Sequence, residues 1–209
     1  MHSFPTEMIC GRRVAFLMAV DAEFGPSLKR LIRPIFIGVG PVEAATKAAM
    51  VLTQLSYLRQ LPDIVVSLGS AGSNSLSRGT VYQASEISYR DMDARPIGFP
   101  IGVTPFLDLP ASLPLSVQLP NVPLATLSSG ANIVTGAGYE LVSTDMVDME
   151  SYSVLRAAMM SDVEMIALRG ISDGAEELTD ISGWTEYLHV VDENLANSLS
   201  GLQVTLQNM

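Results

Sequence analysis

The chain has 209 residues, of which 48% are apolar and 16% are charged, and its mean hydropathy is +0.31. This composition excludes intrinsic disorder, and the length is enough for one sizeable hydrophobic core. The 12 basic and 22 acidic residues give a net charge of −10, which repels nucleic acids and anionic membrane surfaces, so neither is expected as a partner.

Cysteine and histidine are too scarce for disulfide or metal chemistry. Cys10 has no second cysteine to pair with, and His2 and His189 cannot form a His/Cys metal cluster. The N-terminal residues lack the basic start and apolar core of a secretory signal. We therefore expect a cytoplasmic protein that uses no metal and no other cofactor.

A long uncharged stretch runs from Leu109 to Tyr139. Its length would suffice to cross a bilayer, but four prolines within it forbid one continuous apolar helix. We expect buried loops and strands there instead. Because so few charges accompany so much apolar sequence, part of the surface should be hidden in an oligomer, and a homodimer is predicted.

The first part of the chain is predicted to alternate strands and helices. Val14–Met18 is typical of a buried strand and is followed by a helix over Phe24–Leu31 with Pro26 in its first turn. Ile35–Val39 indicates a second strand. Apolar residues then recur at helical spacing from Ala44 to Leu58, which predicts a helix with one buried face.

The middle of the chain leaves this regular pattern. Ile64–Leu68 is a further buried strand that leads into a turn of small residues, Gly69–Gly72. Seven of the twelve prolines then lie between Pro96 and Pro123, and regular structure is interrupted from Arg95 to Val122. Such a long loop in a compact domain is more often functional than idle, so we expect a substrate lid or an oligomer contact.

Regular structure resumes at Pro123–Ser128 and continues with a helix from about Met149 to Met160 and a strand over Met165–Ile171. A last amphipathic helix carries an apolar stripe formed by Trp184, Leu188, Val191, Leu195, Leu199, Leu202 and Leu206. Together the elements predict a single α/β domain over residues 1–209. We expect three layers, α/β/α, with a central mixed, largely parallel sheet and a ligand site at the carboxyl ends of its strands.

Three acidic residues stand where this rule places a site. Glu23 follows the first strand, Glu150 opens a helix and Asp173 ends a strand. Apolar sequence flanks each of them, which favours burial and a perturbed pKa. Structural alternatives remain open, since Glu23 and Glu150 also suit the first turn of a helix and Asp173 also suits a turn cap.

Four segments in colinear order resemble the 5′-methylthioadenosine/S-adenosylhomocysteine nucleosidases of the purine nucleoside phosphorylase superfamily. They are Ala19-Val-Asp-Ala-Glu23, Gly69-Ser-Ala-Gly72, Val147-Asp-Met-Glu150 and Arg169-Gly-Ile-Ser-Asp173. The resemblance implies a nucleoside phosphorylase-like fold and hydrolysis of a 5′-substituted adenosine, with a small-molecule nucleoside as the partner.

The same resemblance assigns roles to residues of this chain. Glu23 would act on the attacking water, Glu150 would bind the ribose hydroxyls and Asp173 would serve the purine N7. Further substrate contacts are implied for Ser70, Ala71, Gly72, Ile133, Met149 and Ser172. Chemistry agrees, because cleavage of a ribosyl C–N bond needs a carboxylate to activate water and an acid to neutralise the departing base.

Departures from the family pattern leave parts of the assignment open. Ser129-Gly-Ala-Asn-Ile133 is one residue shorter than the family's adenine-reading segment and lacks its acid and its aromatic residue. Base recognition and the 5′ substituent therefore stay open. Asp91 and Asp93 are interpreted as structural.

Two other functions compete with hydrolysis. A phosphorylase needs cationic groups to hold phosphate, whereas the first loop here carries Asp21 and Glu23, so water is the better nucleophile. A non-catalytic nucleoside-binding protein of the same fold would leave three acids in catalytic positions without a purpose.

Overall fold

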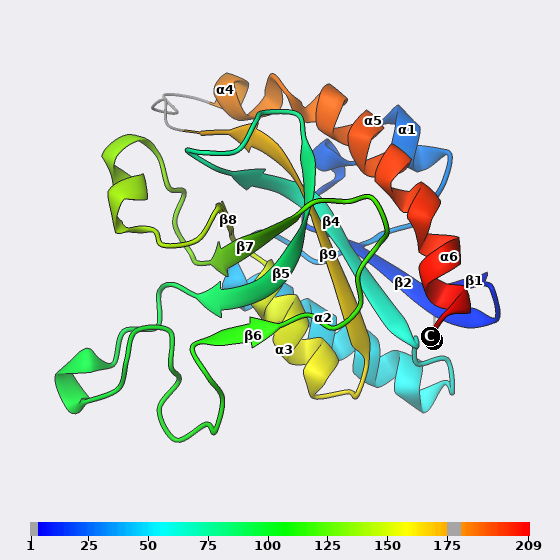
Figure 1. The fold of residues 1–209 in the computed structure, drawn as a ribbon. Helices are drawn as coiled ribbons and strands as arrows, with labels where there is room; N and C mark the ends of the chain where they lie inside the picture. The colour runs from blue at the N-terminus through cyan, green and yellow to red at the C-terminus, as the bar shows by residue number, and fades with distance from the viewer. Residues whose placement is uncertain (1–3, 175–180) are drawn as a thin grey trace.

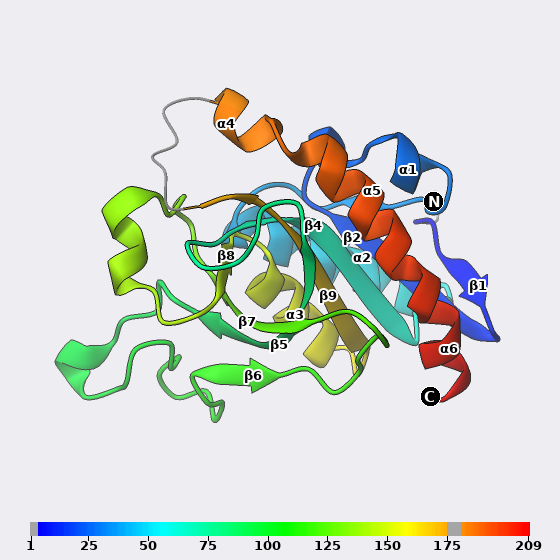
Figure 2. The same ribbon diagram turned by 45° about the horizontal axis from the view of Figure 1, so that its top comes forward.

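The computed structural model describes residues 4–174 and 181–209, which form one mixed sheet with helices on both faces (Figures 1 and 2). The strands are β1 (Glu7–Ile9), β2 (Arg12–Met18), β3 (Ile35–Phe36), β4 (Ile64–Gly72), β5 (Val81–Tyr89), β6 (Ser112–Pro114), β7 (Leu124–Ser129), β8 (Met146–Asp148) and β9 (Glu164–Asp173). The helices are α1 (Pro26–Lys29), α2 (Pro41–Tyr57), α3 (Ser151–Met159), α4 (Ile181–Thr185), α5 (Leu188–Ser198) and α6 (Leu202–Gln207).

The sheet is built around β4 and β9. Strands β3, β2, β4 and β9 run parallel to one another, whereas β5 lies antiparallel to β9 and parallel to β7. The pairing of β4 with β9 shifts by one residue near its end, so that Gly72 lies opposite Asp173. This bulge leaves Ser172 as the extra residue on β9.

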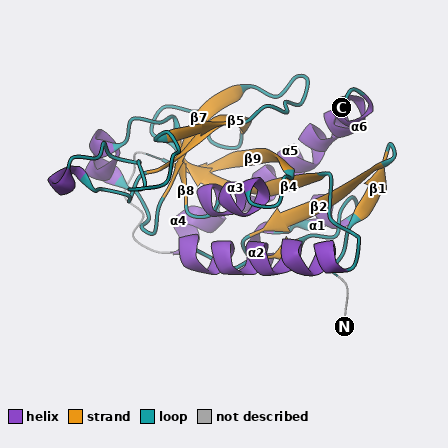
Figure 3. Cartoon of the chain, turned by 90° about the horizontal axis from the view of Figure 1, so that it is seen from below, coloured by secondary structure: helices purple, strands orange, loops and turns teal. Residues whose placement is uncertain are grey.

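Two apolar layers enclose the sheet and confirm the three-layer α/β/α prediction. Successive side chains of a strand point to opposite faces, so Ala15 and Leu17 of β2 pack with α2 and α3, while Val14 and Phe16 pack with α1, α5 and α6. Figure 3 shows α2 and α6 on opposite sides of the strands. Both faces are covered, which explains the nearly continuous apolar runs of β2, β4 and β9.

The predicted turn at Gly69–Gly72 is wrong, because these residues form the last part of β4. Their backbone pairs with β9 from Gly69 opposite Arg169 to Ala71 opposite Ile171. The small residues here let the strand lie close to neighbouring side chains and do not form a turn. A Cβ added at Gly69 would lie 3.1 Å from the Glu23 carboxylate, in a position that leaves little space.

The sequence pattern also missed β5. Its apolar alternation is broken by Gln83, which is fully buried in spite of its amide. The amide nitrogen donates to the carbonyl of Val117, and the amide oxygen accepts from the backbone N–H of Leu119. A buried polar side chain satisfied by a distant loop leaves no local signal of a strand.

Other boundaries differ in detail. The helix predicted over Phe24–Leu31 is reduced to α1, and the strand predicted over Ile35–Val39 is reduced to β3. The single last helix is divided into α4, α5 and α6, with a short 3-10 turn over Leu199–Gly201 before α6. Its stripe from Leu188 to Leu206 is buried as predicted, whereas Trp184 leaves the stripe.

The proline-rich stretch is mostly irregular, as predicted. It contains β6 and a short 3-10 turn over Arg95–Ile97, and it extends at the lower left of Figure 1. Several of its apolar side chains are exposed, and Phe106 is 94% exposed. Of the described helices, none has both the length and the apolar character that crossing a membrane requires.

Candidate active site

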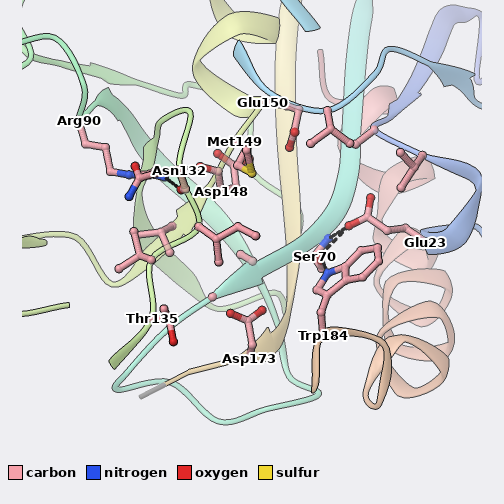
Figure 4. A pocket seen from close by; sticks show the side chains of 18 residues that line it. Glu23, Ser70, Arg90, Asn132, Thr135, Asp148, Met149, Glu150, Asp173 and Trp184 are labelled. Carbon is pink, nitrogen blue, oxygen red and sulfur yellow. Dashed lines mark hydrogen bonds between the residues drawn. The ribbon is translucent and has the colours of Figure 1, made fainter. Parts of the chain in front are cut away.

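A cavity of about 580 Å³ opens at the carboxyl ends of β2, β4 and β9, next to β8, which pairs with the end of β4 (Figure 4). This is the edge at which open α/β sheets bind their ligands. The cavity is lined by Ala19, Val20, Glu23, Val39, Ser70, Ala71, Gly72, Arg90, Asn132, Ile133, Val134, Thr135, Val147, Asp148, Met149, Glu150, Asp173 and Trp184.

The structure brings together all but one of the site residues that the sequence suggested. Those that line the cavity are Glu23, Ser70, Ala71, Gly72, Ile133, Met149, Glu150 and Asp173. Ser172 does not line it. The Ser172 hydroxyl is buried and donates to the Asp173 carboxylate at 2.6 Å, so its contact is with a cavity residue.

Glu23 lies in a 3-10 turn, Asp21–Glu23, directly after β2, and is 6% exposed. One carboxylate oxygen, Oε1, accepts from the Ser70 N–H at 2.8 Å and from the Ser70 hydroxyl at 2.6 Å. The other, Oε2, has no hydrogen-bond partner among the described residues. Burial raises the pKa of Glu23, and the two bonds from Ser70 partly oppose that rise.

Glu150 is the N-cap residue of α3, and its carboxylate accepts from the backbone N–H of Gly40 at 2.8 Å. Burial raises its pKa to about 7, and the nearby Asp148 carboxylate adds to the rise. The side chain therefore links the start of α3 to the start of α2. It does not cap its own helix, since no side-chain capping bond is present.

Asp173 is the last residue of β9 and lies across the cavity from Glu150 (Figure 4). Burial raises its pKa, while the Ser172 hydroxyl bond and the positive charge of Arg78 oppose the rise. Gly72 makes room for it, because a Cβ there would lie 2.8 Å from the Asp173 carboxylate and would also collide with the Tyr139 hydroxyl.

A buried ion pair supports the inner side of the cavity. The Arg169 guanidinium donates to Asp148 at 2.9 Å, and both side chains are almost fully buried. Arg169 also donates to the hydroxyls of Ser67 and Ser151 at 3.0 and 2.6 Å. These bonds connect β9 with β8, β4 and the start of α3, and they hold the segment that carries Glu150.

Arg90 is the cation among the described residues that line the cavity, and it too has hydrogen-bond partners. The guanidinium of Arg90 donates to the carbonyl oxygens of Ser128, Asp148 and Asn132, at 2.8, 2.8 and 2.6 Å. It thereby holds the shortened segment that follows β7. The neighbouring Asp91 accepts from the Ala131 N–H, which agrees with a structural role.

Asp93 also has a structural partner, since its carboxylate pairs with Arg95 on the exposed surface. Within residues 4–174 and 181–209, no group of three or more His, Cys, Asp or Glu side chains is placed to hold a metal ion.

Trp184 is the most informative residue that the sequence reasoning misplaced. It was predicted to pack on the apolar stripe of the last helix, but its indole lines the cavity and its N–H donates to the Ser70 hydroxyl at 3.0 Å. The available signal was chemical, because a tryptophan on an otherwise aliphatic stripe brings an N–H that needs an acceptor when it is partly buried.

We predict that Glu150→Gln stabilises the fold at alkaline pH. The Glu150 carboxyl has a pKa of about 7 in the folded chain against an ordinary 4.5, so the folded chain binds its proton more tightly and the free energy of unfolding falls as pH rises between these values. Removing the charge should raise the melting temperature by a few degrees near about pH 8 and by much less near about pH 5.

Thermal unfolding followed by circular dichroism measures this difference. The matched control is Glu140→Gln, which removes an exposed carboxylate and should change little at either pH. Equal melting temperatures of the Glu150 variant and the unmodified chain at alkaline pH would contradict the prediction.

We compared the chain with known protein families, sequences and solved structures. No family model matches the chain. The nucleosidase for 5′-methylthioadenosine/S-adenosylhomocysteine from Haemophilus ducreyi is 27% identical over 176 residues, which cover 75% of this chain and 72% of that protein.

Two solved structures have a similar fold. The same type of nucleosidase from Colwellia psychrerythraea, in complex with adenine, has a TM-score of 0.71 and 21% identity, with 90% of this chain and 95% of that chain covered. A futalosine hydrolase mutant from Helicobacter pylori has a TM-score of 0.76 and 17% identity, with coverage of 94% and 99%. The chain is thus similar in sequence to the 5′-methylthioadenosine/S-adenosylhomocysteine nucleosidases and has the fold of the solved nucleosidase and futalosine hydrolase structures.

Proposed function

We propose that the protein is an N-ribosyl hydrolase that cleaves a 5′-substituted adenosine into adenine and the 5′-substituted ribose. The observation that carries the proposal is that three carboxylates with raised pKa values, Glu23, Glu150 and Asp173, surround one cavity at the carboxyl ends of the strands. Perturbed acids gathered in a cleft are characteristic of catalytic sites. The homologous nucleosidases support the choice of substrate class.

In this proposal Glu23 is the general base. Two donors from Ser70 occupy Oε1 and leave Oε2 to take a proton from water. The water oxygen then bonds to C1′ as the C–N bond to the base breaks, and the electron pair of that bond goes to the base. A carboxylate is the natural group here, because the ribosyl carbon becomes positively charged in the transition state.

Asp173 completes the reaction as the general acid. A proton on this carboxyl passes to N7 of the purine, so that neutral adenine departs, and solvent returns the proton held by Glu23 to Asp173. Burial raises the pKa of Asp173, which keeps more of it protonated at a given pH.

Glu150 binds the ribose in this proposal. One of its carboxylate oxygens accepts a hydrogen bond from the Gly40 N–H, and the carboxylate accepts further hydrogen bonds from the ribose hydroxyls.

The positively charged groups near the cavity already have partners, which favours hydrolysis over phosphorolysis. Arg90 is the one cation among the described lining residues, and it donates to three carbonyl oxygens. Arg169 lies behind the wall and is paired with Asp148. A phosphate ion entering near Glu23 would meet that carboxylate, whereas Arg90, the cation among the described lining residues, already donates to carbonyl oxygens.

The purified protein should release adenine from 5′-methylthioadenosine at the same rate with and without inorganic phosphate, and in the presence of a metal chelator. Liquid chromatography of the products measures this directly. Dependence on phosphate, with a ribose 1-phosphate as product, would identify a phosphorylase. Tight binding without any turnover would indicate a nucleoside-binding protein.

Asp173→Asn should lower kcat by about 10²- to 10⁴-fold, because an amide can donate a hydrogen bond but cannot transfer a proton. The loss should be much smaller for a nucleoside whose base leaves readily without protonation. Steady-state kinetics on a poor and a good leaving group test this, with the exposed Asp108→Asn as control. An equal loss on both substrates would remove Asp173 from the role of acid.

We further propose that the protein acts as a homodimer. Apolar side chains lie exposed on the proline-rich stretch and beyond it, with Phe106 94%, Leu141 93% and Ile97 67% exposed. An exposed apolar surface of this kind favours association. Light scattering at micromolar concentration should give the mass of two chains, and a mass of one chain would contradict the proposal.

A further inference from the structure

The indole of Trp184 takes part in a chain of hydrogen bonds that ends at Glu23. Its Nε1–H donates to the Ser70 hydroxyl at 3.0 Å, and that hydroxyl donates to Glu23 Oε1 at 2.6 Å (Figure 4). The three residues come from separate parts of the fold: α4, the end of β4 and the turn after β2. Helix α4 therefore reaches the proposed base through one intervening side chain.

The chemistry of the three groups fixes the direction of every bond. An indole N–H can only donate, and an ionised carboxylate can only accept. The Ser70 hydroxyl has a single hydrogen, so when Trp184 donates to its oxygen, that hydrogen is directed to Glu23. Without the indole N–H, the Ser70 oxygen could accept from water, and the hydroxyl could rotate away from Glu23.

This arrangement divides the two oxygens of Glu23 between two tasks. Oε1 receives both the N–H and the O–H of Ser70, at 2.8 and 2.6 Å. Oε2 points away from Ser70 and has no partner among the described residues (Figure 4). A carboxylate that is held at one oxygen keeps the other in a constant position, as a general base requires.

We propose that Trp184 is a positioning residue of the hydrolytic reaction, which acts through Ser70 to hold Glu23 ionised and oriented for the attack of water. The inference rests on the proposed function. Trp184 does more in this view than form an apolar wall of the cavity, because the N–H of its indole, and not only the ring, affects the reaction.

The charges around Glu23 explain why one more bond matters. Burial and Asp148 disfavour a negative charge on Glu23, while the two bonds from Ser70 and the charge of Arg169 favour it. An N–H that donates to the Ser70 oxygen polarises the O–H bond and makes the hydroxyl a stronger donor to the carboxylate. Loss of the indole N–H should therefore raise the pKa of Glu23 further.

Trp184→Phe removes the N–H and keeps an aromatic ring in the cavity wall. A net hydrogen bond contributes about 0.5–1.5 kcal/mol, so the acid limb of the kcat/KM profile should move to higher pH, and kcat/KM on that limb should fall roughly three- to tenfold. Raising the pH should restore most of the rate, while KM changes little. A loss that is the same at every pH, or one confined to KM, would overturn the proposal.

Two comparisons make the test specific. Tyr187→Phe removes a polar atom from an aromatic ring at the start of α5 and keeps the ring over which Arg78 lies, so the acid limb should stay in place. In a Ser70→Ala background, Trp184→Phe should add no further shift, because the connection to Glu23 is already broken. Additive shifts would show that Trp184 acts without Ser70.

A second measurement needs no turnover. Trp184 is the single tryptophan of the chain, so the intrinsic fluorescence excited at indole wavelengths reports on this site. The emission of the unmodified chain should titrate with the ionisation of Glu23, and the transition should disappear in Glu23→Gln. An identical transition in the Gln variant, or no transition in the unmodified chain, would refute the hydrogen-bond chain, whether or not the protein hydrolyses a nucleoside.

Discussion

The buried pair between Arg169 and Asp148 is the interaction on which the cavity depends. A charge pair removed from water stabilises a structure only when its remaining donors and acceptors are satisfied. Here Arg169 is satisfied by Ser67 and Ser151 as well as by Asp148. One guanidinium thus joins three strands and a helix start, and the parts of the wall that come from distant sequence positions keep a common geometry.

The same charge also influences the acids that face the cavity. Arg169 favours the ionised forms of Glu23 and Glu150, while burial opposes them. Burial is the largest of these effects, and the hydrogen bonds from Ser70 to Glu23 and from Gly40 to Glu150 oppose it more strongly than the charge of Arg169 does. Such a site lowers the stability of the fold at neutral pH, which is common where function needs perturbed groups.

Much of this architecture could be predicted from sequence, and the failures have physical causes. Long apolar runs and helical spacing correctly predicted β2, β4, β9 and α2, because both faces of the sheet are covered. Strand β5 was missed since Gln83 is buried with partners far away in sequence. Glu23, Glu150 and Asp173 line one cavity, as expected from strand ends that meet at one edge, and their roles stay a proposal. The position of Trp184 was predicted wrongly, since the predicted single helix is divided and Trp184 lies in the separate helix α4, from which its side chain reaches the cavity.

The bulge at the end of β9 has a consequence of a different kind. The extra residue, Ser172, changes which side chain of β9 lies beside Gly72, and Asp173 takes that place. A strand that lost one residue before this point would bring a different side chain there, even if every residue of the proposed mechanism were still present in the chain. The chemistry at this end of the cavity is therefore encoded by the number of residues in β9 as well as by their identity, so insertions and deletions in this strand should be tolerated less than substitutions.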